Sequence, residues 1–427
     1  MNILRPYRLS LVCLSMFFAW GVVPPAYGES GEEETVTWAD CVAEAKRNNP
    51  NLQAAEASLR AARAEEGKAS SNFYPQVSGR ASASQSKSSG EESSDSYGYS
   101  VSASQLLFDG LKTWYDRDRQ EQNMIAAEAS YDSTSADVRQ SLRDAFIELL
   151  RGQELSRISQ DIAKRRQQQA DLIQLRYNAG REHKGALLTA QANLRSAEAD
   201  IVSAQRAVII AQRNLHAVLG REVFTPLRAE GEFDLTPLPP QYPDFEALLE
   251  GLPAVRKSTA EKTASEYSLK SAGSDFSPSV TASGSLGRSG SDWPPSSESW
   301  SVGVSLSVPI FEGTSKFYEL KRARASLDNA SASLKSQWET SLYTLYRSYN
   351  NLLTAYDQVE VQGLFFEASR ERSKIGMAQY TSGLLIFDNW IIIEDDLVRA
   401  ERSLVQARAD ALYAETQWLK SRGQPLE

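Results

Sequence analysis

The residue types that most often carry out chemistry are scarce in this chain. Its 427 residues include two His and two Cys, too few to build a zinc module or a disulfide scaffold. His183 and His216 have no partner at metal-ligand spacing, and the sequence contains no G-x-S-x-G, H-E-x-x-H, C-x-x-C or phosphate-binding glycine loop. We therefore expect no catalytic residues, no cofactor and no metal. A formal net charge of −9 also argues against a nucleic-acid partner.

The first 28 residues have the pattern of an export signal. Arg5 and Arg8 precede an apolar run from Leu9 to Val23, and small residues then lead to Gly28. A membrane anchor is the alternative, but an apolar run of about 15 residues is shorter than the roughly 20 that span a bilayer as a helix. No later stretch is apolar for long enough, so we expect no helical membrane span after the signal.

The rest of the chain repeats itself at an offset of 203 residues. Landmarks coincide without a gap along both copies: Pro50 with Pro253, Pro75 with Pro278, Val101 with Val304, Tyr177 with Tyr380, Gly180 with Gly383, and Gly220 with Gly423. Five prolines between the copies indicate an irregular connector. We therefore divide the chain into a signal at 1–28, a first structural repeat at 29–224, a Pro-rich connector at 225–243 and a second repeat at 244–427.

Each copy contains segments in which apolar residues alternate with small polar ones, the pattern of a β-strand with two different faces. The first copy has them at 75–84 and 97–108, and the second copy repeats the later one at 300–310. Turn-rich polar segments at 86–96 and 287–298 complete one hairpin per copy. Strands of roughly ten residues are long enough to cross a bilayer at a tilt.

The apolar strand face carries aromatic residues near the loop end. Tyr97, Tyr99 and Trp300 lie where an interfacial aromatic girdle of a membrane barrel would be. The alternative is a soluble two-stranded ribbon that lies on the helices, because alternation alone does not distinguish lipid from a protein surface.

Long helical segments follow the hairpins. The segment from Thr113 to Arg176 has no proline and one glycine, and the segment from Lys316 to Gln379 has no proline. Each run of about 64 residues would extend roughly 96 Å as a helix. In the return segments apolar residues are three and four positions apart, as in a coiled coil. The fold class is therefore α+β and mainly α, with long coiled-coil helices and four β-strands per chain.

Four strands cannot close into a barrel, and open strand edges cannot face lipid because unpaired backbone groups there cost several kcal/mol each. Copies of the chain must therefore combine. Two chains would supply eight strands with a filled interior, whereas three would supply twelve and leave room for a water-filled lumen. The Ser- and Gly-rich strand face favours the wet lumen.

These motifs resemble the outer membrane efflux protein (TolC-like) family. The resemblance covers nearly the whole chain after the signal and rests on these segments: Asn49-Pro50, Phe73-Tyr74-Pro75, Leu107-Phe108-Asp109-Gly110, Arg176-Tyr177-Asn178-Ala179-Gly180, Leu219-Gly220, Pro309-Ile310-Phe311-Glu312-Gly313 and Gln379-Tyr380-Thr381-Ser382-Gly383. It implies a homotrimer with a shared twelve-stranded β-barrel in the outer membrane and a long α-helical barrel in the periplasm. It also implies a periplasmic adaptor protein, an inner-membrane transporter and outer-membrane lipid as partners.

The resemblance assigns roles to several positions. The periplasmic tip and adaptor contact would include Arg176, Tyr177, Gly180, Tyr380 and Gly383. The strand–helix junctions would be formed by Phe108, Gly110, Phe311 and Gly313.

The sequence departs from the family at the acidic residues that often narrow the tip. Asn389 and Ile392 stand at the positions where the family acids align, and Asp388 would supply a shifted ring. A solvated face residue is the alternative for Asp388. The apolar cluster from Trp390 to Ile393 would either narrow the tip or pack between helices.

The function expected from these observations is a passive exit channel of a tripartite efflux pump or type I secretion system, located in the outer membrane with its helices in the periplasm. Selectivity would come from pore width and charged rings. The alternative is a periplasmic or surface coiled-coil scaffold without a conducting pore.

Overall fold

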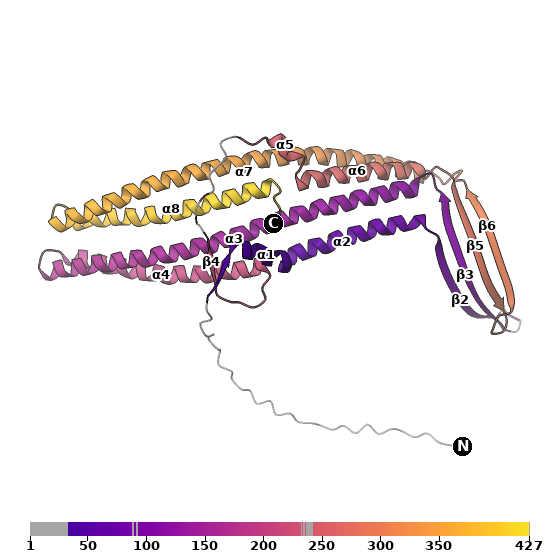
Figure 1. The fold of residues 1–427 in the computed structure, drawn as a ribbon, viewed down its shortest axis with the longest axis horizontal. Helices are drawn as coiled ribbons and strands as arrows, with labels where there is room; N and C mark the ends of the chain where they lie inside the picture. Colours follow the sequence, from indigo (N-terminus) through magenta and orange to yellow (C-terminus); the bar gives the residue numbers. More distant parts are fainter. Residues whose placement is uncertain are drawn as a thin grey trace, which may run out of the picture.

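The computed structural model describes residues 33–87, 89–90, 93–231, 233, 235 and 242–426. The export signal expected at 1–28 lies outside these residues. Figure 1 shows an elongated molecule whose helices run along its long axis, with a β-sheet at one end. None of the helices described combines the length and the apolar character that a membrane span needs.

The first repeat runs from a short strand to a long helical hairpin. Its elements are β1 (Glu34–Thr37), α1 (Trp38–Asn48), α2 (Pro50–Ser70), the short 3-10 helix η1 (Ser71–Phe73), β2 (Gln76–Ser86), β3 (Ser94–Phe108), α3 (Lys112–Asn178) and α4 (Lys184–Leu219).

The second repeat has the same order. Its elements are α5 (Phe245–Leu249), α6 (Pro253–Ser274), β5 (Ser279–Gly290), β6 (Ser297–Ser307), α7 (Ser315–Ser382) and α8 (Phe387–Ser421). Between the repeats, β4 (Leu227–Glu230) pairs in parallel with β1, so a strand lies within the segment that the prolines predict to be irregular. The matching order confirms the internal duplication.

The two longest helices give the molecule its length. α3 has 67 residues and α7 has 68, and each would be about 100 Å long at 1.5 Å per residue. They continue without a break because their interiors contain no proline and few glycines. Each pairs with its return helix, α3 with α4 and α7 with α8, to form the two hairpins that point away from the sheet (Figure 1).

The four long strands form one antiparallel sheet in the order β2-β3-β5-β6. The strands overlap the alternating segments, but their ends differ. β3 begins at Ser94 and β5 continues to Gly290, so both strands extend into the segments expected as turns at 86–96 and 287–298. The sequence pattern extends the last strand to Ile310, but β6 ends at Ser307. Pro309 explains the difference, because proline has no N–H to donate to the neighbouring strand.

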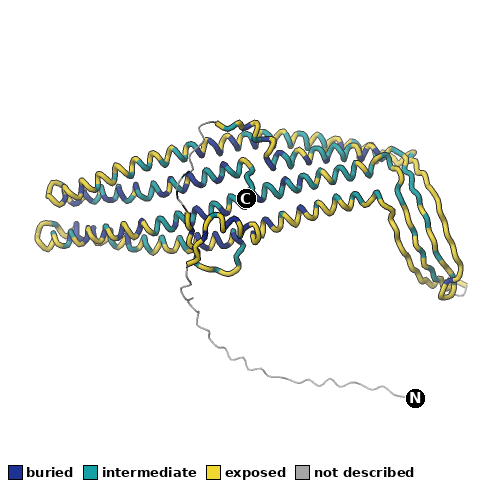
Figure 2. The backbone as a smooth tube through the Cα atoms, viewed as in Figure 1, coloured by how far each residue is buried: buried dark blue, intermediate teal, exposed yellow. Residues whose placement is uncertain are grey.

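The apolar core is divided into clusters along the helices. The largest lies around the middle of α3, where α1, β1, β4 and α4 pack on residues such as Leu142 and Phe146. A second surrounds Leu345 and Tyr349 of α7, and a third lies near the hairpin turns around Trp390. Figure 2 shows this pattern, with buried stretches along the helices and exposed backbone along most of the sheet.

Asn49 joins the ends of two helices in the first repeat. Its Oδ1 accepts hydrogen bonds from the backbone N–H groups of Asn51 (3.0 Å) and Leu52 (3.1 Å), which caps α2. Its Nδ2 donates to the carbonyl of Val218 in the last turn of α4 (2.7 Å). Gly220, at φ +78°, allows this approach, because a Cβ there would lie 2.3 Å from the carbonyl oxygen of Asn48. The end of α4 therefore meets the start of α2, and the two helices together accompany α3.

We expect Asn49→Ala to destabilise the protein by about 2 kcal/mol, because it removes a helix cap and a hydrogen bond to the partly buried carbonyl of Val218. The free energy of unfolding by denaturant measures the loss. Asn51→Ala is the matched control, since Asn51 is exposed and uses only its backbone in this junction. Equal losses in the two variants would contradict the assignment.

Candidate functional site

The sheet has one apolar face and one face of small polar residues. The register places Val77 beside Ala103, Val101 beside Leu286, and Leu286 beside Trp300, so these side chains share a face. On the opposite face, serine hydroxyls hydrogen-bond across strand pairs, Ser78 with Ser102 and Ser285 with Ser301, each at 2.9 Å. The alternation in sequence therefore predicted the two faces correctly.

The apolar face of the sheet is open. Val101, Leu286, Trp300 and Val304 are all more than half exposed. The strands β2 and β6 are the outer strands, and each has one neighbour in the described part of the chain. The sheet thus presents a large apolar surface and two unpaired edges.

The strand–helix junctions of the two repeats differ in their surroundings. Gly110 has φ +70°, and a Cβ there would lie 2.3 Å from Cβ of Ser277, so the second repeat packs closely on this turn. Ser274 also donates a hydrogen bond to the carbonyl of Gly110 (2.7 Å). Gly313 has a similar φ of +67°, but no described atom lies within 4 Å of a Cβ built there. Phe108 and Phe311, which precede these turns, are both exposed.

The turns at the far ends of the helical hairpins have similar backbones. Gly180 and Gly383 are left-handed, at φ +67° and +81°. After each glycine, a backbone N–H reaches back to the helix end: Arg181 donates to the carbonyl of Arg176 and Leu384 to that of Gln379, both at 2.8 Å. Glycine is favoured at this position because it adopts the left-handed conformation without strain.

The two tyrosines of the tip lie in different environments. Tyr380 is buried, and its ring stacks on Trp390 at 4.4 Å between centroids. The guanidinium of Arg176 lies 4.5 Å from the same ring and donates to the Tyr380 carbonyl (2.8 Å). The Tyr380 hydroxyl donates to Glu182 (2.8 Å), and burial raises the pKa of Tyr380 to about 12. Tyr177 is exposed.

The structure brings Arg176 and Tyr380 together but keeps the other tip residues apart from this cluster. Asp388 and Asn389 are exposed in the first turn of α8, and Ile392 is exposed one turn later. Trp390 is fully buried between the hairpins. This residue of the apolar segment 390–393 therefore packs between helices.

Polar contacts between α3 and α8 join the two hairpins, and sequence reasoning did not identify them. Arg165 forms a two-pronged ion pair with Glu401 (3.1 and 2.5 Å), and Arg166 pairs with Asp395. The buried carboxylate of Glu394 accepts from Gln169 (2.8 Å) and from Ser373 (2.6 Å).

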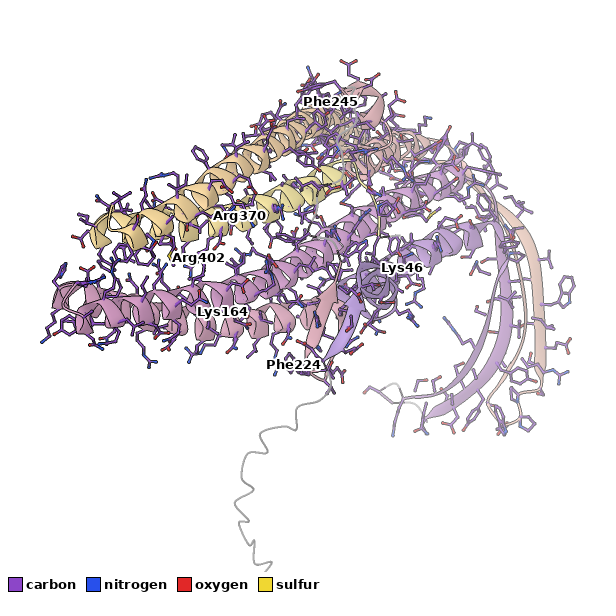
Figure 3. The ribbon with its side chains drawn as sticks, turned by 60° about the vertical axis from the view of Figure 1, so that its left-hand side comes forward. Lys46, Lys164, Phe224, Phe245, Arg370 and Arg402 are labelled. Carbon is purple, nitrogen blue, oxygen red and sulfur yellow. The ribbon has the colours of Figure 1, made fainter. Side chains whose placement is uncertain are left out.

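A further ion pair joins α4 and α8. Arg402 donates to Asp200 (2.6 Å), and Figure 3 shows Arg402 on the side of α8 that faces the other hairpin. Such ion pairs are hard to predict from sequence, because charged residues on a helix face usually point into solvent.

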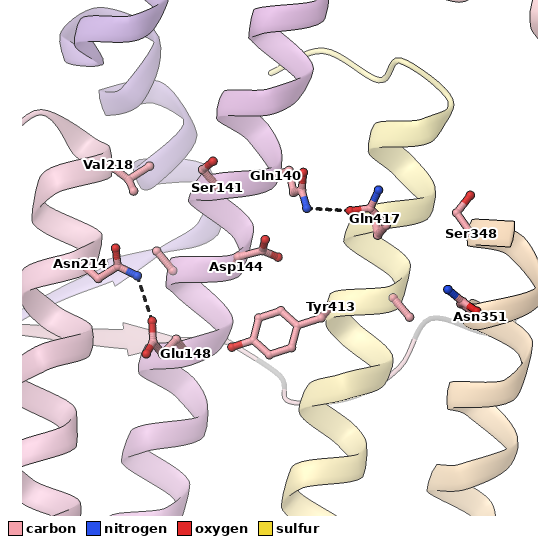
Figure 4. A pocket seen from close by; sticks show the side chains of 12 residues that line it. Gln140, Ser141, Asp144, Glu148, Asn214, Val218, Ser348, Asn351, Tyr413 and Gln417 are labelled. Carbon is pink, nitrogen blue, oxygen red and sulfur yellow. Dashed lines mark hydrogen bonds between the residues drawn. The ribbon is translucent and has the colours of Figure 1, made fainter. Parts of the chain in front are cut away.

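A cavity of about 690 Å³ lies where the two hairpins meet near mid-length, and sequence reasoning missed it as well. Figure 4 shows Asp144 and Tyr413 pointing into it between α3 and α8, beside the hydrogen bonds from Gln140 to Gln417 and from Asn214 to Glu148. Burial raises the pKa of Asp144 to about 6, and its Oδ1 has no hydrogen-bond partner among the described residues.

The two histidines have structural contacts. Nδ1 of His183 accepts a hydrogen bond from the N–H of Ala186 (3.1 Å) and caps α4. His216 is buried, and its Nε2 lies 2.7 Å from the carbonyl oxygen of Thr225. Within the described ranges, no group of His, Cys, Asp and Glu residues is arranged to hold a metal ion.

Comparison with known proteins identifies one family. The model of the outer membrane efflux protein family matches residues 41–221 and again 245–424, one match for each repeat. No curated protein matches the chain in sequence.

Several solved structures have the same fold. The outer-membrane channel OprN is 23% identical, with a TM-score of 0.79 over 91% of this chain and 90% of that one. The outer membrane protein VceC from Vibrio cholerae is 19% identical, with a TM-score of 0.78 over 91% of this chain and 96% of that one. CusC is 18% identical, with a TM-score of 0.82 over 94% of this chain and 96% of that one.

Asp144→Asn should stabilise the protein near neutral pH. The carboxyl has a folded-state pKa of about 6, above the ordinary aspartate value of 3.8. Between these two pH values the folded state therefore binds more protons than the unfolded state. The contribution of Asp144 to the stability of the protein falls as the pH rises. Midpoints of thermal unfolding from pH 4 to pH 8 measure this dependence, which the variant should reduce. Asp137→Asn is the control, because the Asp137 side chain is 54% exposed. An unchanged pH profile in Asp144→Asn would contradict the prediction.

Proposed function

Because the chain belongs to the outer membrane efflux protein family, we propose that three copies of it form the exit channel of a tripartite efflux pump or type I secretion system. Membership of the family places the protein in the outer membrane, with its helices in the periplasm, and favours a duct over a scaffold without a pore. The observation that carries the proposal is the sheet, which has an exposed apolar face, a serine-lined face and two unpaired edges.

The strand directions permit closure by identical copies. All neighbours in the order β2-β3-β5-β6 are antiparallel, so β6 of one copy can pair antiparallel with β2 of the next. Three copies supply twelve strands, with the apolar face toward lipid and the serine face toward a wet lumen. Strands of 11 residues, the length of β2 and β6, are about 37 Å long. At a tilt near 45° they span roughly 26 Å, close to the apolar band of an outer-membrane barrel.

The helices supply a second argument for a ring. Ile158 and Ile162 of α3 are 8% and 3% exposed because they pack beside Val405 of α8. Their repeat equivalents, 203 positions later on α7, are Val361 and Phe365, which are 41% and 60% exposed. The equivalent of Val405 is Val202 on α4, which is also exposed. The apolar contact therefore exists between the two repeats. The equivalent residues, Val202, Val361 and Phe365, are exposed and have no such contact with one another among the described residues.

The turn at Gly313 is likewise exposed where its equivalent in the first repeat is packed. Its equivalent Gly110 packs on Ser274 and Ser277, which correspond to Ser71 and Tyr74 in the first repeat. In a ring, Gly313 of one copy packs on Ser71 and Tyr74 of the next. Such head-to-tail interfaces close when the rotation between copies matches the number of subunits.

The remaining parts of the proposal concern the tip and the partners. The tip residues Arg176, Tyr177, Gly180, Tyr380 and Gly383 would lie at the periplasmic end, where an adaptor protein docks and links the channel to an inner-membrane transporter. Tyr380 would support the tip from inside, because it is buried against Trp390, whereas Tyr177 is available at the surface. Asp388 and Asn389 would line the constriction.

A cross-link between copies tests the ring. In the chain, Ser271 of α6 donates to Asp116 of α3 (2.9 Å), and the repeat equivalents of these residues are Lys68 and Glu319. We expect the double variant Lys68→Cys/Glu319→Cys to give a covalent trimer with a short bismaleimide, seen by denaturing electrophoresis. Cys41 is buried and its pKa is raised to about 12, so it should not react.

The duplication also supplies the matched control for this experiment. Asp116→Cys/Ser271→Cys should react within one chain and leave the monomer mass unchanged. Trimer bands in both variants, or in neither, would contradict the proposed neighbour contact.

Conductance tests the pore itself. Detergent-solubilised protein should insert into a planar bilayer and give discrete current steps, and it should not dissolve without detergent. Asp388→Ala should reduce cation selectivity or block by divalent cations if Asp388 lines the constriction. Asn389→Ala controls for a change of shape at the adjacent position. A normal current in Asp388→Ala would remove Asp388 from the constriction, while the absence of any current would argue against a channel.

A further inference from the structure

The four long strands carry four charged side chains, and the strand register divides these charges between the two faces of the sheet. Arg288 lies opposite Tyr99, which belongs to the apolar face, and opposite Glu298, to which it donates a hydrogen bond (3.0 Å). Asp95 shares this face, because it lies four residues from Tyr99 on the same strand. These three charges lie near the hairpin loops. The remaining charge is Arg80, near the middle of β2.

Arg80 lies on the face of small polar residues. It is opposite Ser100, and Ser100 is opposite Gly287 on the next strand. Ser78, two residues before Arg80, shares its face and hydrogen-bonds to Ser102 across the strand pair (2.9 Å). Arg80 is exposed, and among the described residues none forms an ion pair or a hydrogen bond with its side chain. Within the four strands, the serine face therefore carries a single charge, which no described acid neutralises.

The second repeat shows that the fold does not require a charge at this position. The equivalent of Arg80, 203 positions later, is Ser283. Ser283 lies opposite Ser104 on one neighbouring strand and opposite Gly303 on the other, so it is also surrounded by small residues. A ring of three copies would therefore contain three arginines, one on each β2, and a serine at each equivalent position of β5.

We propose that Arg80 determines the charge preference of the β-barrel: three copies of it form a cationic ring in the lumen, which favours anionic over cationic solutes. This inference rests on the proposed function, because the serine face lines a lumen only when copies close a barrel. The guanidinium stays charged throughout the physiological pH range. A charge at mid-strand on the lipid face would be costly, whereas the lumen is wet. Low-dielectric walls also focus the field of like charges into the channel that they enclose.

The size of the effect depends on the salt concentration. In water, a unit charge about 10 Å away changes the local concentration of a monovalent ion roughly twofold, and the three arginines act together. The Debye length is about 30 Å in 0.01 M salt and about 3 Å in 1 M salt. The contribution of Arg80 should therefore be clear in dilute salt and nearly absent in concentrated salt. Only the difference between variants is informative, because Asp388 would favour cations at the other end of the channel.

Reversal potentials under a potassium chloride gradient measure the charge preference of the full-length protein in planar bilayers. We expect Arg80→Ser, which introduces the residue of the second repeat, to raise the permeability ratio of potassium to chloride at least about twofold in dilute salt. Arg80→Glu should raise the ratio further, and Arg80→Lys, which keeps the charge, should leave it unchanged. Arg288→Gln is the matched control, because Arg288 is a strand arginine on the opposite face and should not affect the ratio.

Thiol reactivity detects the same charge without a current. Ser100→Cys places a thiol opposite Arg80 on the serine face, and its rates with a negatively and a positively charged methanethiosulfonate reagent are compared. Adding Arg80→Ser should lower the ratio of the first rate to the second at least about twofold in dilute salt. Ser104→Cys, about 13 Å farther along the strand, should respond less. Cys41 should not react, because it is buried and its pKa is raised to about 12.

The two measurements separate this proposal from the channel itself. Current steps with an unchanged permeability ratio in Arg80→Ser and Arg80→Glu would overturn the role of Arg80 and leave the channel intact. An equal change in Arg288→Gln would overturn it as well. A lack of current in the wild type would contradict the proposed channel instead. In that case an unchanged ratio of reaction rates at Ser100→Cys would also overturn the placement of the Arg80 charge on the serine face.

Discussion

Backbone hydrogen bonding in hydrocarbon is the constraint on which the rest of the structure depends. Lipid offers no donor or acceptor, so each strand edge that enters a bilayer must find another strand. The sheet of this chain satisfies the inner edges of its four strands and leaves β2 and β6 open. A sheet with one serine-lined face and one apolar face is suited to separate water from lipid. It can do so only after its two outer strands have paired with other strands. The proposed function therefore belongs to an assembly of copies, in which each chain would supply one third of the wall of a twelve-stranded barrel.

The helices, like the strands, have surfaces without a partner in the single chain, because the two repeats have different neighbours. In one chain the first repeat has a neighbour and the second repeat has a bare flank, as the exposed Val361 and Phe365 show beside the buried Ile158 and Ile162. In the proposed ring, one interface design would be used twice, once within the chain and once between chains. The open turn at Gly313 belongs to the same set of unpartnered surfaces. Helices near 100 Å in length cannot be stabilised by a single globular core, so in the proposed ring the lateral contacts repeated around the circumference would stabilise them.

The positions of helices and strands could be predicted from the sequence better than the environments of individual side chains. α3 and α7 begin and end within three residues of the expected segments, because long runs without proline and glycine turns at Gly180 and Gly383 are strong local signals. The faces of the sheet followed from alternation, but several strand ends did not: β6 stops before Pro309, and β3 and β5 extend into segments expected as turns. The environments of Tyr177 and Tyr380 could not be predicted, since the two residues are equivalent in sequence but one is exposed and the other is stacked on Trp390. The same holds for Asp144 and Glu394, because packing between α3 and α8 leaves Asp144 half-buried and buries Glu394.

The divergence of the two repeats has a consequence for the interior of a trimer. Asp144 of α3 corresponds to Arg347 of α7, and Glu148 corresponds to Asn351. Since the backbones are equivalent, these positions lie at the same level of their helices, and in a ring of three they would alternate around the circumference. Asp144 and Arg347 would then place acids and bases at successive positions instead of a ring of one sign. Electrostatic selection at this level would be weak, because charges of alternating sign offset one another and salt screens exposed charges over a Debye length of about 8 Å. Charge selection within the helical barrel would therefore depend on the narrow tip, where Asp388 has no acidic or basic equivalent in the first repeat, because Gly185 occupies that position.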